Sequence, residues 1–280
     1  MPELPEVETV RQTLLEYLPG LTITGVNVHL ARIVKYPEPE QFAKELVGQS
    51  FRDIKRRGKY LKFVLSGEQT LVIHLRMTGQ LRYSLPTEPV LRHTHIIFSL
   101  SDGHELRYTD IRQFGTMYLA DNRQIDEISG MYRLGWEPLT DFPLADFAAL
   151  LKGRKRAKIK SLLLDQHVIA GIGNIYADEA LFIAKIHPAR LANSLSSAEV
   201  ARLHRAIVQV LRAGVKMHGT SFSDYVDGLG RQGEFQHQLA VYGREGAPCP
   251  CCGSEIVRQK IAGRSSHFCP LCQPASEHVN

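Results

Sequence analysis

The spacing of hydrophobic and polar positions changes along the chain. Residues 6–18 carry apolar side chains at helical intervals, and Pro19-Gly20 ends the pattern, which predicts an amphipathic helix near the amino terminus. A leading helix followed by an antiparallel β-sandwich or barrel is therefore expected in the first half. The short alternating or β-branched runs that predict strands lie at residues 21–30, 60–65, 69–75, 95–100 and 105–108.

Helical periodicity dominates the second half of the chain. Residues 131–143 break the strand rhythm with one glycine and two prolines, and we place the domain boundary there. Helices are expected near residues 159–164 and 175–185, and Ser196-x-x-Glu199 has the form of a capping box before a longer helix. The predicted fold class is α+β, with an N-terminal β-sandwich, a helical domain and a metal-binding β-hairpin.

Length and charge narrow the function. The 280 residues are enough for two domains, and no apolar run is long enough to cross a bilayer, so we expect a soluble protein without a membrane partner. A net charge of +5 is mild support for a polyanionic partner. Residues 51–62 hold six basic residues and one acid, and residues 151–160 hold six basic residues and no acid. Two such clusters favour a groove for nucleic acid over two solvated faces.

Four cysteines near the carboxyl end form two pairs, Cys249 with Cys252 and Cys269 with Cys272. Two tight turns that each present two thiolates can close a tetrahedral site, so the spacing predicts one structural zinc ion in a ribbon or finger. Two disulfides are the alternative, but Cys251 makes the count odd and no secretory signal is evident. Cys251 could compete for the metal, although two-residue spacing favours Cys252.

The amino terminus offers a nucleophile. Removal of Met1 would leave Pro2 as a secondary amine, which can attack a sugar carbon and form an iminium adduct. The iminium acidifies the neighbouring carbon, so elimination follows, and Glu3 could move protons there. From this fragment alone, an ordinary Met-Pro start is the commoner explanation.

A glycine pair precedes the helix expected near residue 175. Gly171-x-Gly173-Asn174 would let a phosphate approach backbone amides at the helix start. Such a pair is more often a tight turn, but Lys155 and Lys160 just upstream favour a DNA phosphate clamp to which Asn174 adds its amide.

Six separated motifs together resemble bacterial formamidopyrimidine-DNA glycosylase over essentially the whole chain. They are PELPEVETV, RRGKYL, HLRMTG, DIRQFG, LLLDQHVIAGIGNIYADEALF and the CPCC with GRSSHFCPLC finger. The resemblance implies a helix-two-turns-helix motif and a bifunctional base-excision repair enzyme. Such an enzyme removes 8-oxoguanine and formamidopyrimidines from duplex DNA and then cleaves the abasic strand. By that similarity Pro2 forms a Schiff base, Glu3 donates a proton, Lys59 serves β-elimination, and Arg264 in the finger assists δ-elimination.

The family must also extrude the damaged base from the duplex, which leaves a gap in the stack. Met77, Arg112 and Phe114 match its void-filling residues, although core positions would otherwise be the simpler explanation of Met77 and Phe114. His93 and Lys155 match positions that bind the DNA backbone.

Residues 219–236, which are rich in glycine, correspond to the family's loop over the extruded base. The expected partner is damaged double-stranded DNA, and we expect a monomer in the bacterial cytoplasm that is nucleoid-associated when bound. The expected domains are a β-sandwich at residues 1–133, a linker at 134–145, a helical DNA-binding domain at 146–240, a zinc finger at 241–273 and a tail at 274–280.

Two alternatives stay open. An endonuclease VIII-like relative would share the fold and the proline chemistry but prefer oxidised pyrimidines; the PELPEVET start and the void-filling set argue against it. A zinc-dependent DNA-binding protein without catalysis would bind DNA with strong salt dependence and leave a damaged duplex uncut. Gln113 replaces a residue that is commonly basic in the family, and we expect this replacement to weaken a phosphate contact.

Overall fold

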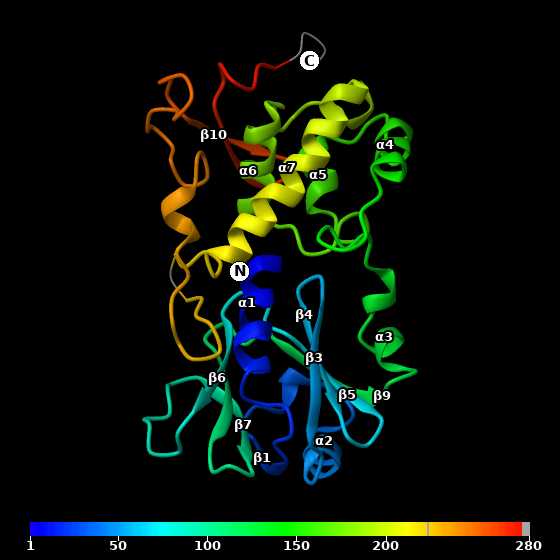
Figure 1. Ribbon diagram of the computed structural model, residues 1–280, viewed down its shortest axis with the longest axis vertical. Coiled ribbons are helices and arrows are strands. Elements are labelled where there is room, and N and C mark those ends of the chain that lie inside the picture. The colour runs from blue at the N-terminus through cyan, green and yellow to red at the C-terminus, as the bar shows by residue number, and fades with distance from the viewer. Residues whose placement is uncertain (223, 276–280) are drawn as a thin grey trace. The chain divides into compact units, whose positions relative to one another are not determined.

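The computed structural model describes residues 1–222 and 224–275, which form two compact units. The first unit comprises Met1–Arg133 and Met217–Gln236, and the second comprises Leu134–Lys216 and the described residues from His237 onward. Figure 1 labels the elements of both units, and each unit is described by itself. Within the described ranges, no helix combines the length and the apolar character needed to span a bilayer.

Two sheets enclose the core of the first unit. Four antiparallel strands pair in the order β1, β7, β8, β6. Five strands pair in the order β2, β9, β5, β4, β3, and only β2 runs parallel to its neighbour. The expected sandwich is confirmed, with this one parallel pair added. The strands are β1 (Ile23–Val28), β2 (Val34–Tyr36), β3 (Phe51–Arg57), β4 (Tyr60–Leu65), β5 (Gln69–His74), β6 (Gly79–Ser84), β7 (Thr94–Leu100), β8 (Glu105–Asp110) and β9 (Thr116–Asp121).

Strand β4 shows why these segments pair as they do. Leu61, Phe63 and Leu65 alternate into the core, while the residues between them are half-buried on the other face. Strand β3 was not expected, because its two buried residues, Phe51 and Ile54, lie three positions apart, with a register shift between Phe51 and Asp53 in the pairing with β4. Pairing with β4 and two buried side chains therefore form a strand inside a basic cluster without a regular alternation.

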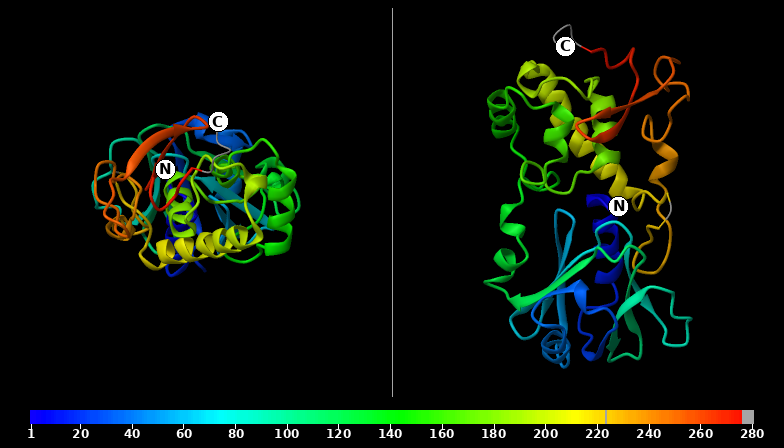
Figure 2. Two further views of the ribbon diagram at one scale, coloured as in Figure 1. Left: turned by 90° about the horizontal axis from the view of Figure 1, so that it is seen from above. Right: turned by 180° about the vertical axis from the view of Figure 1, so that it is seen from behind.

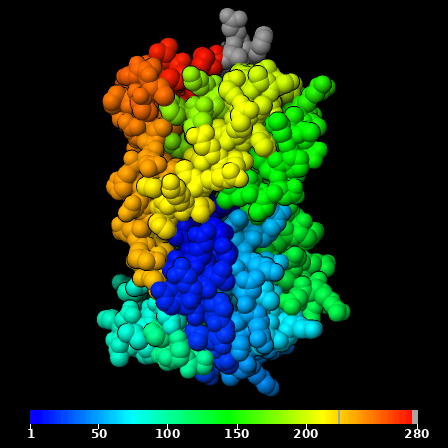
Figure 3. All heavy atoms as spheres, viewed as in Figure 1, coloured from blue at the N-terminus to red at the C-terminus, as the bar shows by residue number. Residues whose placement is uncertain are grey.

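Helix α1 (Leu4–Leu15) packs against the first unit's core through its buried face. It begins two residues before the expected range, because Pro5 needs no intrahelical hydrogen bond in the first turn. Its other side remains at the surface, as the dark blue atoms in Figure 3 show. The shorter helices of this unit are α2 (Pro39–Leu46), η1 (Ala31–Ile33), α3 (Ile125–Ile128) and η2 (Met131–Arg133).

Residues 217–236 follow the helical half in sequence but pack within the first unit. The Tyr83 N–H donates to the carbonyl of Gly228 at 2.8 Å. A side chain would not fit at Gly228, because a Cβ there would lie 2.8 Å from Leu14 Cδ2. The range 146–240 expected as one helical domain is thus interrupted in space, since the glycines let this segment approach α1.

The second unit is built from α4 (Leu144–Gly153), α5 (Ile159–Leu164), α6 (Asn174–Ala184) and α7 (Ser197–Lys216). Helices α5 and α6 occupy the expected ranges to within one residue. The expected capping box is also present, since the Ser196 N–H donates to Glu199 Oε2 at 2.8 Å and the Glu199 N–H donates to Ser196 Oγ at 3.3 Å. The short 3₁₀ segments are η3 (Ala192–Ser194) and η4 (Phe235–Gln238).

A β-hairpin completes the second unit and lies against α6, as the two views of Figure 2 show in orange and red. Its strands are β10 (Val257–Ile261) and β11 (Arg264–Phe268). Ala262 and Gly263 connect them with φ of 50° and 79°, the geometry of a tight hairpin turn. The expected zinc-finger hairpin is therefore present.

Candidate active site and metal centre

A reciprocal cap holds the amino terminus. The Glu3 N–H donates to Glu6 Oε2 at 2.8 Å, and the Glu6 N–H donates to the Glu3 side chain. Pro2 and Glu3 are both buried. While Met1 is attached the Pro2 nitrogen is an amide, so nucleophilic chemistry at Pro2 requires its removal.

Glu6 also joins the amino terminus to residues 217–236. Its Oε1 accepts the Thr220 N–H at 2.8 Å, and its backbone carbonyl accepts the Tyr225 hydroxyl at 3.2 Å. The segment expected to cover an extruded base is therefore fastened beside Glu3. Glu6 was not among the predicted site residues, although Glu3-x-x-Glu6 has the spacing of a capping box.

Lys59 lies in the tight turn between β3 and β4, and its side chain is buried. Gly58 makes the turn possible with φ of 55°. Burial above all, together with the charges of Arg76 and Lys59, holds the pKa of His74 well below its usual range. His74 Nδ1 accepts the Arg76 N–H at 2.9 Å, which fits a neutral ring. His74 was not predicted, although it begins the HLRMTG motif.

Met77, Arg112 and Phe114 lie on two turns, the first between β5 and β6 and the second between β8 and β9. Met77 is 37% exposed and Phe114 is 52% exposed, so neither is a core residue. The Arg112 guanidinium carbon lies 4.9 Å from the centroid of the Phe114 ring. A thioether, a planar cation and an aromatic ring are therefore all available to a partner.

Asp110, at the end of β8, ties these turns together. Its carboxylate is buried and accepts the Thr78 hydroxyl and, at 2.8 Å, the Gly115 N–H. Its own N–H donates to the carbonyl of His93 at 3.0 Å. Asp110 thus connects the turn after β5, the turn after β8 and His93. It belongs to the DIRQFG motif, but no local pattern shows that this carboxylate is buried.

In the second unit, two lysines that were both expected to contact a phosphate differ in their exposure to solvent. Lys155 is exposed, whereas Lys160 is 1% exposed. The Lys160 Nζ lies 2.6 Å from Asp178 Oδ1 and donates to Ser265 O and Ser266 Oγ, each at 2.7 Å. The expected phosphate contact of Lys160 is therefore wrong, because the first turn of α5 directs its ammonium into the protein.

Asn174 and Arg264 lie at neighbouring ends of α6 and β11. The Asn174 Nδ2 donates to Ser265 O at 2.9 Å, while its Oδ1 is buried and has no hydrogen-bond partner among the described residues. Arg264 is exposed and begins β11 directly after the hairpin turn. The hairpin tip thus presents a cation beside the start of α6.

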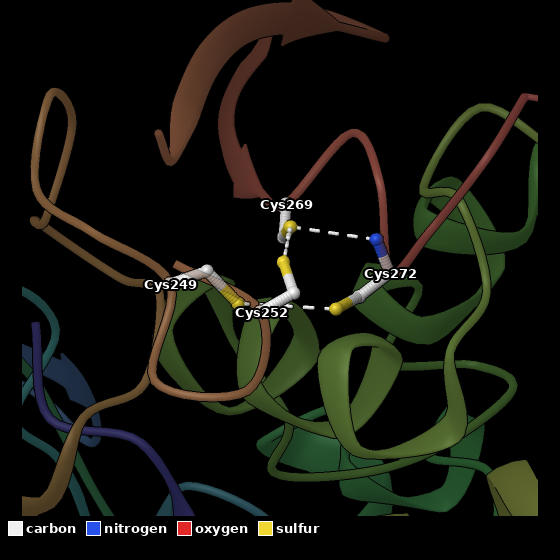
Figure 4. Close-up of side chains that lie close together, drawn as sticks. All are labelled: Cys249, Cys252, Cys269 and Cys272. Carbon is white, nitrogen blue, oxygen red and sulfur yellow. Dashed lines mark hydrogen bonds between the residues drawn. The ribbon is translucent and has the colours of Figure 1, made fainter. Parts of the chain in front are cut away.

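The four paired cysteines converge at the base of the hairpin (Figure 4). Their sulfur atoms lie within 4.8 Å of one another, with Cys249 3.9 Å from Cys272 and Cys252 3.4 Å from Cys269. Four thiolates around zinc, with Zn–S distances of about 2.3 Å, would be about 3.8 Å apart. The sulfur positions fit one tetrahedral zinc ion with every coordination position filled by protein. Cys251 is exposed and outside the cluster, so Cys252 is the cysteine of this pair that lies within reach of the other three sulfur atoms.

Three family models match successive parts of this chain. They are the formamidopyrimidine-DNA glycosylase N-terminal domain at residues 1–117, the formamidopyrimidine-DNA glycosylase H2TH domain at residues 134–226, and the zinc finger found in FPG and IleRS at residues 246–275. The formamidopyrimidine-DNA glycosylase of Heliobacterium modesticaldum is 53% identical over 277 residues, which cover 98% of this chain and 100% of the relative. This chain belongs to the formamidopyrimidine-DNA glycosylase family.

Further relatives agree. The formamidopyrimidine-DNA glycosylase of Desulforamulus reducens is 50% identical over 276 residues, which cover 98% of this chain and 100% of the relative. A solved complex between Lactococcus lactis Fpg and an abasic site containing DNA has a TM-score of 0.92 at 39% identity and covers 98% of this chain and 100% of that one. The protein is accordingly a DNA glycosylase of base-excision repair that binds DNA and carries one structural zinc.

Proposed function

We propose that this glycosylase excises oxidised purines, namely 8-oxoguanine and formamidopyrimidines, and then cleaves the strand by β,δ-elimination. The capped amino terminus carries this proposal, because it holds a potential amine nucleophile and a carboxyl group at one buried point. A solved relative at 39% identity, Lactococcus lactis FPG, is in complex with a Fapy-dG containing DNA, which supports the substrate class.

The proposed reaction begins once Met1 has been removed. The neutral Pro2 amine attacks C1′ of the damaged nucleotide, and the glycosidic bond breaks as the base leaves with the bonding electrons and takes up a proton. Glu3 then protonates the sugar ring oxygen, so that the ring opens and the Pro2 nitrogen forms an iminium with C1′. Burial of both residues keeps water away from this adduct.

Strand cleavage follows from the iminium. It acidifies C2′, loss of that proton expels the 3′ phosphate, and a second elimination expels the 5′ phosphate. We assign proton transfer in the first elimination to Lys59 and assistance of the second to Arg264. A cation beside a leaving phosphate stabilises the charge that develops there. Both are placed by tight turns that contain glycine, Gly58 before Lys59 and Gly263 before Arg264.

We assign DNA contacts to those residues of the predicted set that are exposed or partly exposed. Met77, Arg112 and Phe114 fill the gap left by the extruded base, as their exposure on two turns allows. His93 and Lys155 contact the backbone, and Asn174 lines a phosphate clamp at the start of α6. A monomeric state, a cytoplasmic location and nucleoid association on DNA belong to the same proposal.

Borohydride trapping on duplex DNA that contains 8-oxoguanine tests the proposal. We expect a covalent protein–DNA adduct that peptide mapping places on Pro2. Glu3→Gln should lower base excision at least about 100-fold, because it removes the proton donor. The matched control is Pro5→Ala, which alters the first turn of α1 but leaves the terminal amine, and it should trap like the wild type.

Three results would decide against the proposal. An adduct on a lysine contradicts the role of Pro2, and salt-dependent binding without cleavage indicates a non-catalytic protein. The third result is a preference for oxidised pyrimidines, which is measured with a panel of damaged duplexes. This measurement is needed because one solved Lactococcus lactis relative, 39% identical to this chain, is a complex with an oxidized pyrimidine containing DNA. Faster excision of an oxidised pyrimidine than of 8-oxoguanine would refute the purine assignment.

A further inference from the structure

Strand β11 of the hairpin is held from two sides. On one side it pairs with β10, from Arg264 opposite Ile261 to Phe268 opposite Val257. On the other side, α5 and α6 contribute polar side chains that bind its backbone. The carbonyl of Ser265 accepts two of these donors, Lys160 Nζ at 2.7 Å and Asn174 Nδ2 at 2.9 Å.

Asp178, on α6, completes this set of contacts. Its Oδ1 lies 2.6 Å from Lys160 Nζ, and its Oδ2 accepts the backbone N–H of His267 at 2.9 Å. The side chains of Asp178 and Lys160 are 0% and 1% exposed. Two charges so deeply buried are tolerated only in a well-defined geometry with further hydrogen bonds, because each has lost its hydration. The pair therefore fixes the backbone of residues 265–267 in one position.

Arg264 directly precedes this fixed stretch. Its side chain is exposed and makes no hydrogen bond or ion pair in the described part of the chain, so side-chain contacts do not place it. Its position depends on the backbone of β11, which Lys160, Asn174 and Asp178 hold against α5 and α6. Movement of this backbone would carry the guanidinium with it.

We propose that Asp178 and Lys160 are positioning residues for Arg264. The inference rests on the proposed role of Arg264 in δ-elimination. A displacement of about 1 Å in a group that acts on a leaving phosphate can reduce the rate of that step about 100-fold. The ion pair therefore sets how far strand cleavage proceeds, from the β product to the β,δ product, without touching the DNA.

Asp178→Asn is the direct test, since it keeps the size of the side chain and removes the charge that holds Lys160. On duplex DNA with 8-oxoguanine, we expect the rate of conversion of β product to β,δ product to fall about tenfold, with base excision and zinc content unchanged. The matched control is Glu199→Gln, which removes the charge from another ion pair of the same unit, 2.8 Å from Arg190 and away from the hairpin. It should leave the product ratio as in the wild type.

Two further variants keep the inference testable if Asp178→Asn folds poorly. Ser266→Ala removes one acceptor of Lys160 without changing any charge and should lower δ-elimination about twofold to threefold. The double variant Lys160→Met with Asp178→Leu replaces the buried pair by apolar groups and should restore the thermal midpoint but not the product ratio. Recovery of both would show that the pair only stabilises the fold, which overturns the inference.

The outcomes separate this inference from the proposed function. If the wild-type protein forms no δ product, the role of Arg264 in δ-elimination is contradicted. Amide exchange then still tests whether Asp178 holds the backbone of β11, because the His267 N–H should exchange faster in Asp178→Asn. If the wild type forms δ product and Asp178→Asn forms it equally fast with full zinc content, the positioning role is refuted.

Discussion

At the scale of single residues, burial separates side chains that look alike in the sequence. Lys155 and Lys160 belong to one basic run, yet the first is exposed and the second is paired with Asp178 inside the protein. In the other basic run, Arg56 lies 2.9 Å from Glu8, and its side chain is only 7% exposed. Part of each cluster thus stabilises the fold, and only the remainder can face DNA.

His74 gives a prediction about pH. Its pKa in the folded protein is well below the unfolded value of about 6.5, because burial and two nearby cations disfavour its charged form. When the pH falls below about 6.5, His74 takes up a proton in the unfolded chain but resists protonation in the folded protein. The free energy of unfolding therefore falls as the pH falls. Between pH 7.5 and 5.5 we expect wild type to lose about 1 kcal/mol more unfolding free energy than His74→Gln does.

Urea unfolding at the two pH values measures this difference. Gln is close to His in size and remains polar, so the variant removes the titration without introducing a charge. His29→Gln, at an exposed position, is the control and should keep the wild-type pH dependence. Parallel losses of stability in wild type and His74→Gln would contradict the prediction.

At the scale of elements, helix α6 binds two segments of the second unit that follow α7 in sequence, residues 240–242 and the β-hairpin. Asp178 holds the hairpin, and its neighbour Glu179 accepts the backbone N–H groups of Ala240, Val241 and Tyr242, each at 2.9 Å. Burial raises the pKa of Glu179, and these three hydrogen bonds oppose that shift. One helix thus organises the chain before and within the zinc finger.

Replacing Glu179 by Gln tests this anchor. An amide has one acceptor oxygen where the carboxylate has two, so at least one buried N–H loses its partner, and we expect unfolding free energy to fall by about 2 kcal/mol. Thermal unfolding of the zinc-loaded protein provides the measurement. The control is Glu245→Gln, which loses only an exposed ion pair with Arg258 at 3.6 Å and should change stability little. Equal midpoints for Glu179→Gln and wild type would refute the anchor.

At the scale of the whole molecule, the first unit and the zinc finger of the second unit are stabilised in different ways. The first unit contains a large apolar core between its sheets. The finger has small clusters among the described residues: Phe182, Val241 and Ile256 pack around Cys249 and Cys269, and Ile261 and Phe268 pack with Ala189. A segment with so few buried side chains depends on its metal, because apolar burial alone does not offset the loss of chain entropy.

Zinc removal should therefore affect the finger alone. After chelation we expect the hairpin amides to exchange freely, DNA affinity to fall at least about tenfold, and the core amides of the first unit to stay protected. Zinc addition should reverse the change, and Cys251→Ser should keep one zinc per chain. Unchanged DNA affinity in zinc-free protein would show that the finger does not need the metal for binding.

Features that depend on near neighbours in the chain could be predicted from the sequence. The capping box at Ser196, helix α5 and the two cysteine pairs all follow from residues a few positions apart. Strands β3, β6 and β9 were not expected, because their buried positions do not alternate regularly along the chain. The catalytic candidates Pro2, Glu3, Lys59 and Arg264 came from motifs, and their roles stay predictions.

Other features depend on which distant segments meet, and only the tertiary structure shows them. Lys160 binds Ser265 across 105 positions of sequence, and Glu6 binds Thr220 across 214. Whether a charge faces solvent or an internal partner is decided by the topology that brings those segments together, since burial removes hydration and makes pairing obligatory. The sequence thus predicts the chemistry and the metal ligands, while the fold assigns Lys160, Asp178 and Glu6 to an internal framework of hydrogen bonds and ion pairs.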